Sequence, residues 1–264
     1  MTDLSQLINR MGQATGRGVR IAIVDTGIEA DHPWIGGRLT ASYFVEDSPG
    51  GSPIVHAVPA KDVCGHGTAA AGQARRLAPD AELISVRVLG DDRAGSSEAL
   101  VAALAWLTTQ DVHVVNLSLS TMRLGLAFRI LQAVDALHAR NIPCVCAQGY
   151  HRSGQDYPTS FASTLGVTYD EMPAASICFR PGSLVEFAAG GVDIEAAWLG
   201  KSTRRVTGSS YAAPLVSGLC ARLLELNPDL TPYELKTLLK AYADRLTAGW
   251  AEGWMAAADR PPGP

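Results

Sequence analysis

Three short motifs, far apart in the chain, hold an aspartate, a histidine and a serine. Asp25 ends an apolar run in front of a Thr-Gly pair, and His66 stands between two glycines at the head of a run of small residues. Ser210 follows a Gly-Ser pair at the start of an apolar stretch. These residue types together can activate a hydroxyl group, with histidine as the base and aspartate as its orienting partner. The set could therefore carry out nucleophilic catalysis.

Each motif also has an ordinary explanation when it is taken alone. Asp25 could belong to a dinucleotide site, but no Gly-x-Gly-x-x-Gly fingerprint follows its strand. His66 could be a capping or buried structural histidine, and Ser210 could be a simple helix N-cap. A helix start also favours developing negative charge, which suits an activated serine. The combination of the three motifs favours the catalytic interpretation.

Apolar runs and amphipathic stretches alternate along the chain and must position these residues. The patterns predict buried strands over residues 19–25, 83–89, 112–119 and 143–147, and helices over residues 98–108 and 126–140. Buried strands separated by crossover helices predict a parallel sheet covered on both faces. Asp25 then lies at the carboxyl end of a strand, where such sheets bind ligands.

The remaining chain is divided between an irregular part and a helical part. Residues 149–209 are rich in Gly, Pro and Ser and predict loops and edge strands. Residues 211–226 predict a helix that stops at an Asn-Pro pair, and Thr231 begins another that runs to about residue 243. We expect one domain over residues 1–264, with an N-terminal segment (1–18) and a loose tail (251–264).

Composition excludes several classes of protein. The 264 residues are 47% hydrophobic and 18% charged, which excludes disorder, and the net charge of −4 predicts no binding to nucleic acid or anionic membranes. The longest apolar run, residues 99–107, is too short to span a membrane, and no secretory signal is visible. We therefore expect a soluble cytoplasmic protein.

The five cysteines do not suggest a disulfide framework. Their number is odd, and most of them lie in apolar stretches. Cys144 and Cys146 form a Cys-x-Cys pair on a predicted strand, but no second pair or histidine cluster supplies further metal ligands. Buried, reduced thiols are the expectation, with no metal and no cofactor.

The three motifs, in the chain order Asp, His, Ser, resemble those of the subtilisin-like serine proteases. Residues 78–89 resemble the segment that leads into the family's substrate-binding strand, and residues 115–119 resemble its other substrate-pairing strand. The resemblance runs from about residue 19 to about residue 246. It implies an α/β fold of three layers, the subtilisin-like fold, with a mainly parallel central sheet and helices on both faces.

The resemblance implies a serine endopeptidase that cleaves peptide bonds through an acyl-enzyme on Ser210. His66 would be the general base and Asp25 would orient it. The peptide or protein substrate would lie extended and pair its backbone with two segments. These segments contribute the expected substrate-binding residues Gly90, Gly95, Ser118, Leu119 and Ser120.

The expected oxyanion-binding residue departs from the family. An asparagine normally follows an Ala-Gly pair there, whereas this chain has Tyr150, with Gln148 nearby. Either the tyrosine hydroxyl or the glutamine amide could donate the hydrogen bond. This departure leaves open a catalytically weak or inactive homologue that binds peptides. A peptide ligase or cyclase is also compatible with these residues.

Two further departures concern segments rather than single residues. Only residues 75–77 separate the small-residue helix from the Ala-Pro pair that follows, which leaves no room for the family's calcium-binding loop. About 18 residues precede the first strand, fewer than a folding-assisting propeptide would need. The propeptide has been removed, or the protein folds without one. With the free cysteines, this suggests an intracellular protease that processes a dedicated precursor.

The substrate pocket also contains unusual residues. In the family, a Tyr-Pro pair follows the base of the pocket that receives the side chain before the scissile bond, and here this places Asp156 at that base. A carboxylate there would favour lysine or arginine. The alternative is a loop of different length, with Asp156 in solvent. Ser120 and Thr121 replace glycines, so they narrow the pocket or occupy an exposed strand end.

Two other histidines lie in sequence near segments of the expected site. His32 resembles part of the family's turn after the catalytic aspartate and is expected to be structural. His151 follows Tyr150 and could reach the active site.

Overall fold

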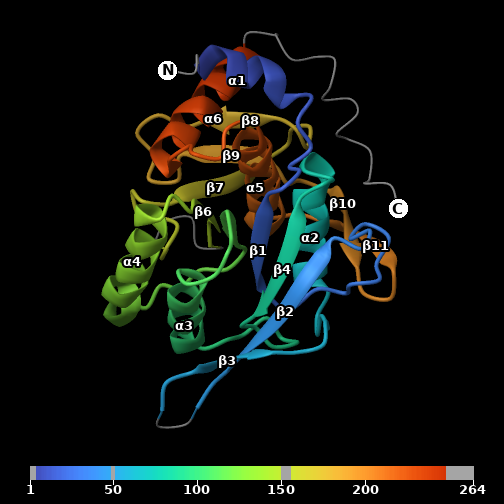
Figure 1. The fold of residues 1–264 in the computed structure, drawn as a ribbon, viewed down its shortest axis with the longest axis vertical. Coiled ribbons are helices and arrows are strands. Elements are labelled where there is room, and N and C mark those ends of the chain that lie inside the picture. The colour runs from blue at the N-terminus through green and yellow to red at the C-terminus, as the bar shows by residue number, and fades with distance from the viewer. Residues whose placement is uncertain (1–3, 49–50, 150–155, 248–264) are drawn as a thin grey trace.

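The computed structural model describes residues 4–48, 51–149 and 156–247. A nine-stranded sheet runs through its centre (Figure 1). Every neighbouring pair is parallel except the pairs at the two edges, which are antiparallel. In spatial order the strands are β3 (Ile54–Ala57), β2 (Leu39–Glu46), β4 (Glu82–Arg87), β1 (Arg20–Asp25), β5 (Val114–Leu117), β6 (Cys144–Ala147), β7 (Leu165–Asp170), β9 (Phe187–Gly190) and β8 (Ile177–Phe179).

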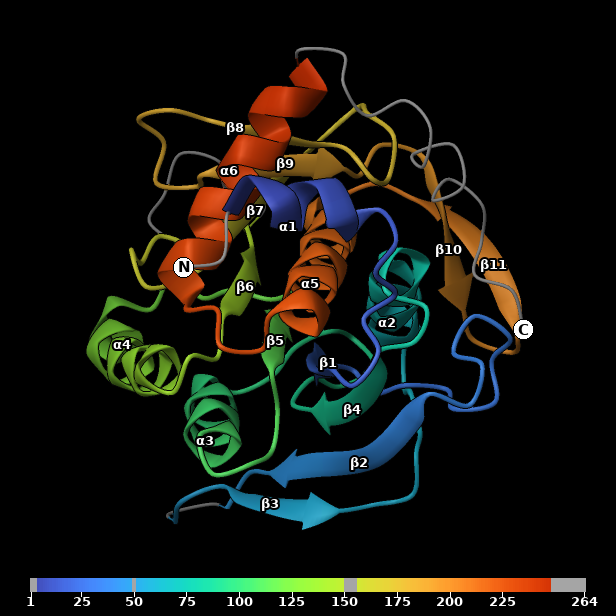
Figure 2. The same cartoon turned by 45° about the horizontal axis from the view of Figure 1, so that its top comes forward.

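Helices cover both faces of the sheet. One face carries α1 (Leu4–Met11), α2 (His66–Leu77), α5 (Ser209–Leu226) and α6 (Pro232–Thr247), and the other carries α3 (Ser97–Leu107) and α4 (Leu124–Ala139). Figure 2 shows α1 and α6 lying close to the end of α5. A separate hairpin, β10 (Ile194–Trp198) and β11 (Ser202–Val206), packs beside α2.

Strand β1 shows how the sequence builds these layers. Its side chains alternate, so Ile21 and Ile23 pack under α2 and α5 while Ala22 and Val24 pack under α3 and α4. Both faces of the strand are buried, which explains its continuous apolar run. The predicted three-layer α/β fold is therefore confirmed, with two hydrophobic cores separated by one sheet.

Most predicted elements are present, with shifts of a few residues at their ends. The expectation of loops and edge strands for residues 149–209 was wrong in one respect, because β7 and β9 both lie inside the sheet, and β8 is the edge strand. Strand β7 has a glycine at Gly166, where a Cβ would lie 2.8 Å from the Thr159 carbonyl oxygen. Close backbone approach thus explains the glycine that made this strand look like a loop.

Two further features bear on the sequence predictions. No helix among the described residues is both long and apolar enough to cross a membrane. All five cysteines lie within the described residues and are free, and the sulfur atoms of Cys144 and Cys146 lie side by side at 3.6 Å.

Candidate active site

The three predicted catalytic residues come together at the carboxyl end of β1, an interior strand of the sheet. Asp25 is the last residue of β1, His66 is the first residue of α2, and Ser210 is the second residue of α5. The helices α2 and α5 pack against each other on the same face of the sheet. His66 and Ser210, which follow Asp25 by 41 and 185 positions in the sequence, are thus brought to the end of its strand.

Asp25 and His66 form a buried ion pair. Nδ1 of His66 lies 2.7 and 2.9 Å from the two carboxylate oxygens of Asp25, and both side chains are almost fully buried. The Thr26 backbone N–H also donates to the carboxylate, at 2.7 Å. Burial alone would lower the pKa of His66, but the charge and hydrogen bond of Asp25 outweigh it and raise that pKa above its usual value.

Ser210 lies at the N-terminus of α5 in a polar network with β5. Its hydroxyl donates to the Ser118 carbonyl oxygen at 3.1 Å, and the Ser118 hydroxyl donates to the Ser210 carbonyl oxygen at 2.8 Å. The Asn116 amide donates to the Ser118 hydroxyl at 3.0 Å, and the Ser217 hydroxyl donates to Asn116. Attack on a substrate requires the Ser210 hydroxyl to turn from Ser118 toward His66, a rearrangement that substrate binding often brings about.

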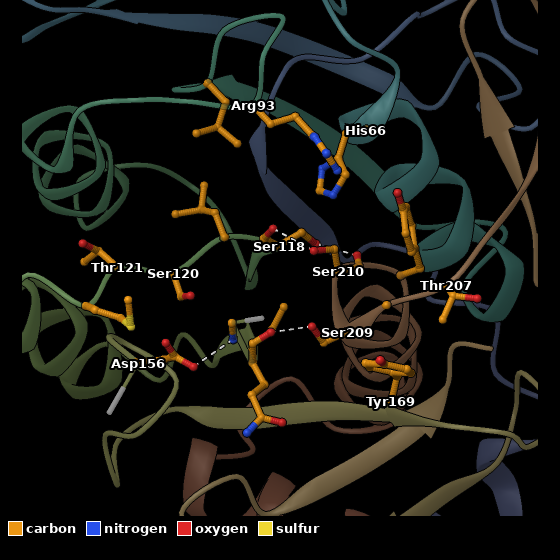
Figure 3. Close-up of a pocket in the computed structure, with 18 of the residues that line it drawn as sticks. His66, Arg93, Ser118, Ser120, Thr121, Asp156, Tyr169, Thr207, Ser209 and Ser210 are labelled. Carbon is orange, nitrogen blue, oxygen red and sulfur yellow. Dashed lines mark hydrogen bonds between the residues drawn. The ribbon is translucent and has the colours of Figure 1, made fainter. Parts of the chain in front are cut away.

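A cavity of about 540 Å³ opens over these residues (Figure 3). His66 and Ser210 line it, whereas Asp25 lies buried behind His66. Four of the predicted substrate-binding residues line it as well, namely Ser118, Leu119, Ser120 and Asp156, and so does Gln148, one of the two candidate oxyanion donors.

The second predicted substrate-binding segment, which follows β4, lines the cavity with residues other than the predicted ones. Leu89, Asp92 and Arg93 line the cavity, whereas Gly90 and Gly95 are not among its lining residues. The Gly90 N–H donates to the Ala94 carbonyl oxygen at 2.8 Å, so its backbone closes the loop itself.

The start of α5 is suited to stabilise negative charge. The first N–H groups of a helix lack intrahelical acceptors, and Ser210 is in this first turn. Gly208 precedes the helix at φ 152°, a conformation that other residues rarely adopt. The Ser209 hydroxyl donates to the Gln148 carbonyl oxygen and ties the end of β6 to this helix. Tyr150, the other predicted oxyanion donor, lies outside the described residues, as does His151.

Asp156 is buried at the far side of the same cavity from His66 (Figure 3). Its Oδ2 accepts the Gly149 N–H at 3.0 Å. A Cβ on Gly149 would lie 2.7 Å from both Asp156 Oδ1 and the Ser120 hydroxyl, so the two side chains flank this glycine. Reciprocal backbone bonds between Thr121 and Tyr157, both 2.9 Å, hold the two walls together. The Asp156 carboxylate is therefore part of the cavity wall and is shielded from bulk solvent.

Sequence reasoning missed Asp62, which anchors the histidine-bearing helix. Its carboxylate accepts hydrogen bonds from the N–H groups of Cys64, Gly65 and Thr68 and from the hydroxyls of Thr26 and Thr68, at 2.6–2.9 Å. The signal was present in the sequence, because an aspartate shortly before a helix is a usual partner for its free N–H groups.

His32 lies in a structural turn. Its ring accepts the Trp34 N–H at Nδ1 and bonds the Ser202 carbonyl oxygen at Nε2, which joins the turn to β11.

Comparison with known proteins identifies the family of the chain. The family model for the subtilase family matches residues 16–254. Subtilisin Savinase from Lederbergia lenta is 31% identical over 243 residues, which cover 88% of this chain and 86% of the relative. An alkaline protease from Alkalihalobacillus alcalophilus is also 31% identical, and there the match covers 60% of its length.

Solved structures show the same fold. A cold-adapted subtilisin-like serine proteinase superposes with a TM-score of 0.70 at 25% identity, covering 86% of this chain and 83% of that one. Sphericase superposes with a TM-score of 0.72 at 22% identity, covering 89% and 88%. On the family match, the identity to curated relatives and the shared fold, the chain belongs to the subtilase family.

Proposed function

We propose that this protein is a serine endopeptidase that hydrolyses peptide bonds through an acyl-enzyme on Ser210. One observation carries the proposal: His66, paired with the buried Asp25 at 2.7 Å, lines the same cavity as a serine at a helix N-terminus. Two of the relatives named above are themselves described as an alkaline protease and a serine proteinase.

The residues divide the work as follows. The Ser210 oxygen attacks the substrate carbonyl carbon while its proton passes to Nε2 of His66. The C–N bond then breaks, and His66 returns the proton to the departing amine. Water then attacks the ester carbonyl carbon while its proton passes to His66. The C–O bond to Ser210 breaks, His66 returns the proton to the Ser210 oxygen, and the acid product leaves. Asp25 holds Nδ1–H throughout and stabilises the imidazolium.

The developing oxyanion would receive the Ser210 N–H at the start of α5. A second hydrogen-bond donor to the oxyanion would come from Gln148, which lines the cavity, or from Tyr150. The substrate would lie extended between residues 92–93 on one side and Ser118–Ser120 on the other, with the side chain before the scissile bond directed toward Asp156.

Fluorophosphonate labelling tests the nucleophile directly. We expect the wild-type protein to be labelled on Ser210, and Ser210→Ala to lose both label and peptide hydrolysis while its circular dichroism stays unchanged. Ser202→Ala, which alters an exposed serine of β11 outside the cavity, is the matched control and should still be labelled. A folded protein whose Ser210 stays unlabelled would instead be a peptide-binding homologue.

The location and natural substrate belong to the same proposal. We infer an intracellular enzyme that processes a dedicated precursor, supported by the five free cysteines. One relative is named an extracellular serine proteinase, so the location calls for a direct measurement. Immunodetection in cell lysate and medium should find the protein in the lysate, and recovery mainly from the medium would overturn this inference.

A further inference from the structure

The loop between β4 and α3 presents a cation to the active-site cavity. Arg93 N–H donates to the Gly90 carbonyl oxygen at 3.1 Å, and Gly90 N–H donates to the Ala94 carbonyl oxygen at 2.8 Å. These bonds form a tight turn with Arg93 near its tip. Arg93 and His66 both line the cavity.

The backbone conformation of Arg93 is unusual for its residue type. Its φ is +62°, in the left-handed region that glycine and asparagine adopt more easily than arginine. Backbone strain of this kind is concentrated at functional sites, where a particular side chain is needed. The turn thus carries an arginine where a smaller residue would fit its backbone better.

The guanidinium of Arg93 is directed toward His66, on one side of Ser210, whereas Asp156 lies on the opposite side (Figure 3). Arg93 is close enough to His66 for its charge to oppose protonation of the imidazole. The cavity thus has a cation beside the catalytic base and a carboxylate at its far side.

An extended peptide presents successive side chains in opposite directions. If the side chain before the scissile bond is directed toward Asp156, the preceding side chain is directed toward His66 and Arg93. We propose that Arg93 selects an acidic side chain at the second residue before the scissile bond. The preferred cleavage sequence would be an acidic residue followed by lysine or arginine. This inference rests on the proposed peptidase function and deepens it.

Asp92 lines the same cavity and carries the opposite charge. Its Oδ1 accepts the Ala94 N–H at 2.9 Å within the turn, which directs the carboxylate to the loop's own backbone. The test must still distinguish the two charges, because a dominant Asp92 would favour a basic side chain at the same substrate position.

Paired peptides that differ only in Glu or Gln at the second position, both followed by Arg, give the measurement. We expect wild-type kcat/KM to favour Glu by about fivefold, or about 1 kcal/mol, since Arg93 is exposed. Arg93→Asn suits the left-handed backbone and removes the charge, so its Glu/Gln ratio should fall to about one. Arg93→Lys should retain most of the preference. Arg140→Asn, at the exposed end of α4, is the matched control and should keep the wild-type ratio.

The outcomes separate this inference from the proposed function. Cleavage of both peptides at equal rates, or a preference for Gln, would overturn the role of Arg93 and leave the peptidase intact. No cleavage of any peptide would instead overturn the proposed function. Peptide binding to Ser210→Ala, measured by calorimetry, provides a readout without turnover and should show the same preference for Glu. Because the interaction is exposed, added salt should weaken it.

Discussion

The surroundings of His66 shift its pKa in opposite directions. Burial lowers its pKa, while the Asp25 carboxylate raises it through both charge and hydrogen bond. Arg93 lowers the pKa and Asp62 raises it, each by a smaller amount. The net effect is a pKa above the usual value of 6.5. A general base works only when unprotonated, so the pH dependence of activity follows from this balance.

We expect kcat/KM to rise with pH through a midpoint above 6.5. Asp25→Asn removes the charge that favours the imidazolium, so the midpoint should move to lower pH. The same change should lower kcat by about 10⁴-fold, because the imidazole loses its orienting partner. Asp229→Asn, an exposed change at the other end of α5, is the control and should leave the profile unchanged. A midpoint unmoved in Asp25→Asn would contradict the assigned role of this pair.

Asp156 is expected to set the preference for the residue before the scissile bond. A buried carboxylate favours a cationic side chain and disfavours a large apolar one, by about 2–3 kcal/mol or about 30–150-fold in kcat/KM. Peptides that differ only in Arg or Phe should therefore be cleaved at very different rates, and Asp156→Asn should remove most of the difference. Asp170→Asn, an exposed carboxylate outside this cavity, is the control. A wild-type preference for Phe would rule the assignment out.

At the scale of elements, the active site depends on how the N-terminus of α2 is held. Gly67 lies so close to the turn after β1 that a Cβ would come within 2.0 Å of the Gly27 carbonyl oxygen. The Thr26 hydroxyl accepts the Gly67 N–H and donates to Asp62. These contacts lock the helix start against the strand that carries Asp25, so the ion pair with His66 depends on them.

Asp62→Ala should therefore lower both stability and activity. Five hydrogen bonds lose their acceptor, and we expect the free energy of unfolding to fall by about 2–4 kcal/mol. Asp62→Asn keeps Oδ1 as an acceptor but places an amide against the two donors of Thr68, so it should have an intermediate effect. Urea denaturation with parallel kcat/KM measurements checks this order. A loss below 0.5 kcal/mol in Asp62→Ala would show that the carboxylate does not anchor the helix.

The C-terminal end of α2 explains why the protein should not need calcium there. The buried guanidinium of Arg75 donates to the carbonyl oxygens of Trp34 and Pro79. A positively charged side chain of the protein thus binds these carbonyl groups. We expect neither calcium nor EDTA to shift the melting temperature. Arg75→Met should lower it, since the carbonyls lose their donors, whereas the exposed Arg140→Met should not. A rise of several degrees on adding calcium would contradict this expectation.

At the scale of the whole molecule, the beginning of the chain is tied to its C-terminal helices. Leu7, Ile8 and Met11 of α1 are buried in the core beneath α5 and α6. Glu225 on α5 accepts the N–H groups of residues 15, 16 and 17. Arg222 donates to the carbonyl oxygens of Met11 and Gly12. These contacts join segments about 210 residues apart in sequence.

Because both hydrophobic cores pack against the same sheet, we expect them to unfold together in a single transition. Far-UV circular dichroism and tryptophan fluorescence should give the same midpoint, since Trp34, Trp106 and Trp198 report on different parts of the structure. Glu225→Ala should lower the free energy of unfolding by about 1.5–3 kcal/mol. The midpoint should fall accordingly, and the transition should remain single. Two separate transitions would indicate independently folding units.

Local patterns in the sequence predicted much of the fold. Buried parallel strands are apolar on both faces, so β1, β4, β5 and β6 could be read from continuous apolar runs. Helices α3 and α4 followed from three- and four-residue spacing. Strand β7 was missed because its composition is mixed and because it contains a glycine. That glycine is required by the close approach of another backbone segment, which a local sequence pattern does not reveal.

The sequence by itself determined the residue types, their order and the kinds of element that carry them, which was enough to single out Asp25, His66 and Ser210. Only the tertiary structure decided what each side chain meets. The acceptor role of Asp62, the burial of Asp156 and the position of Arg93 beside His66 all depend on segments distant in sequence. Periodicity follows from local backbone geometry, whereas charges and hydrogen bonds depend on distances that exist only after the chain has folded.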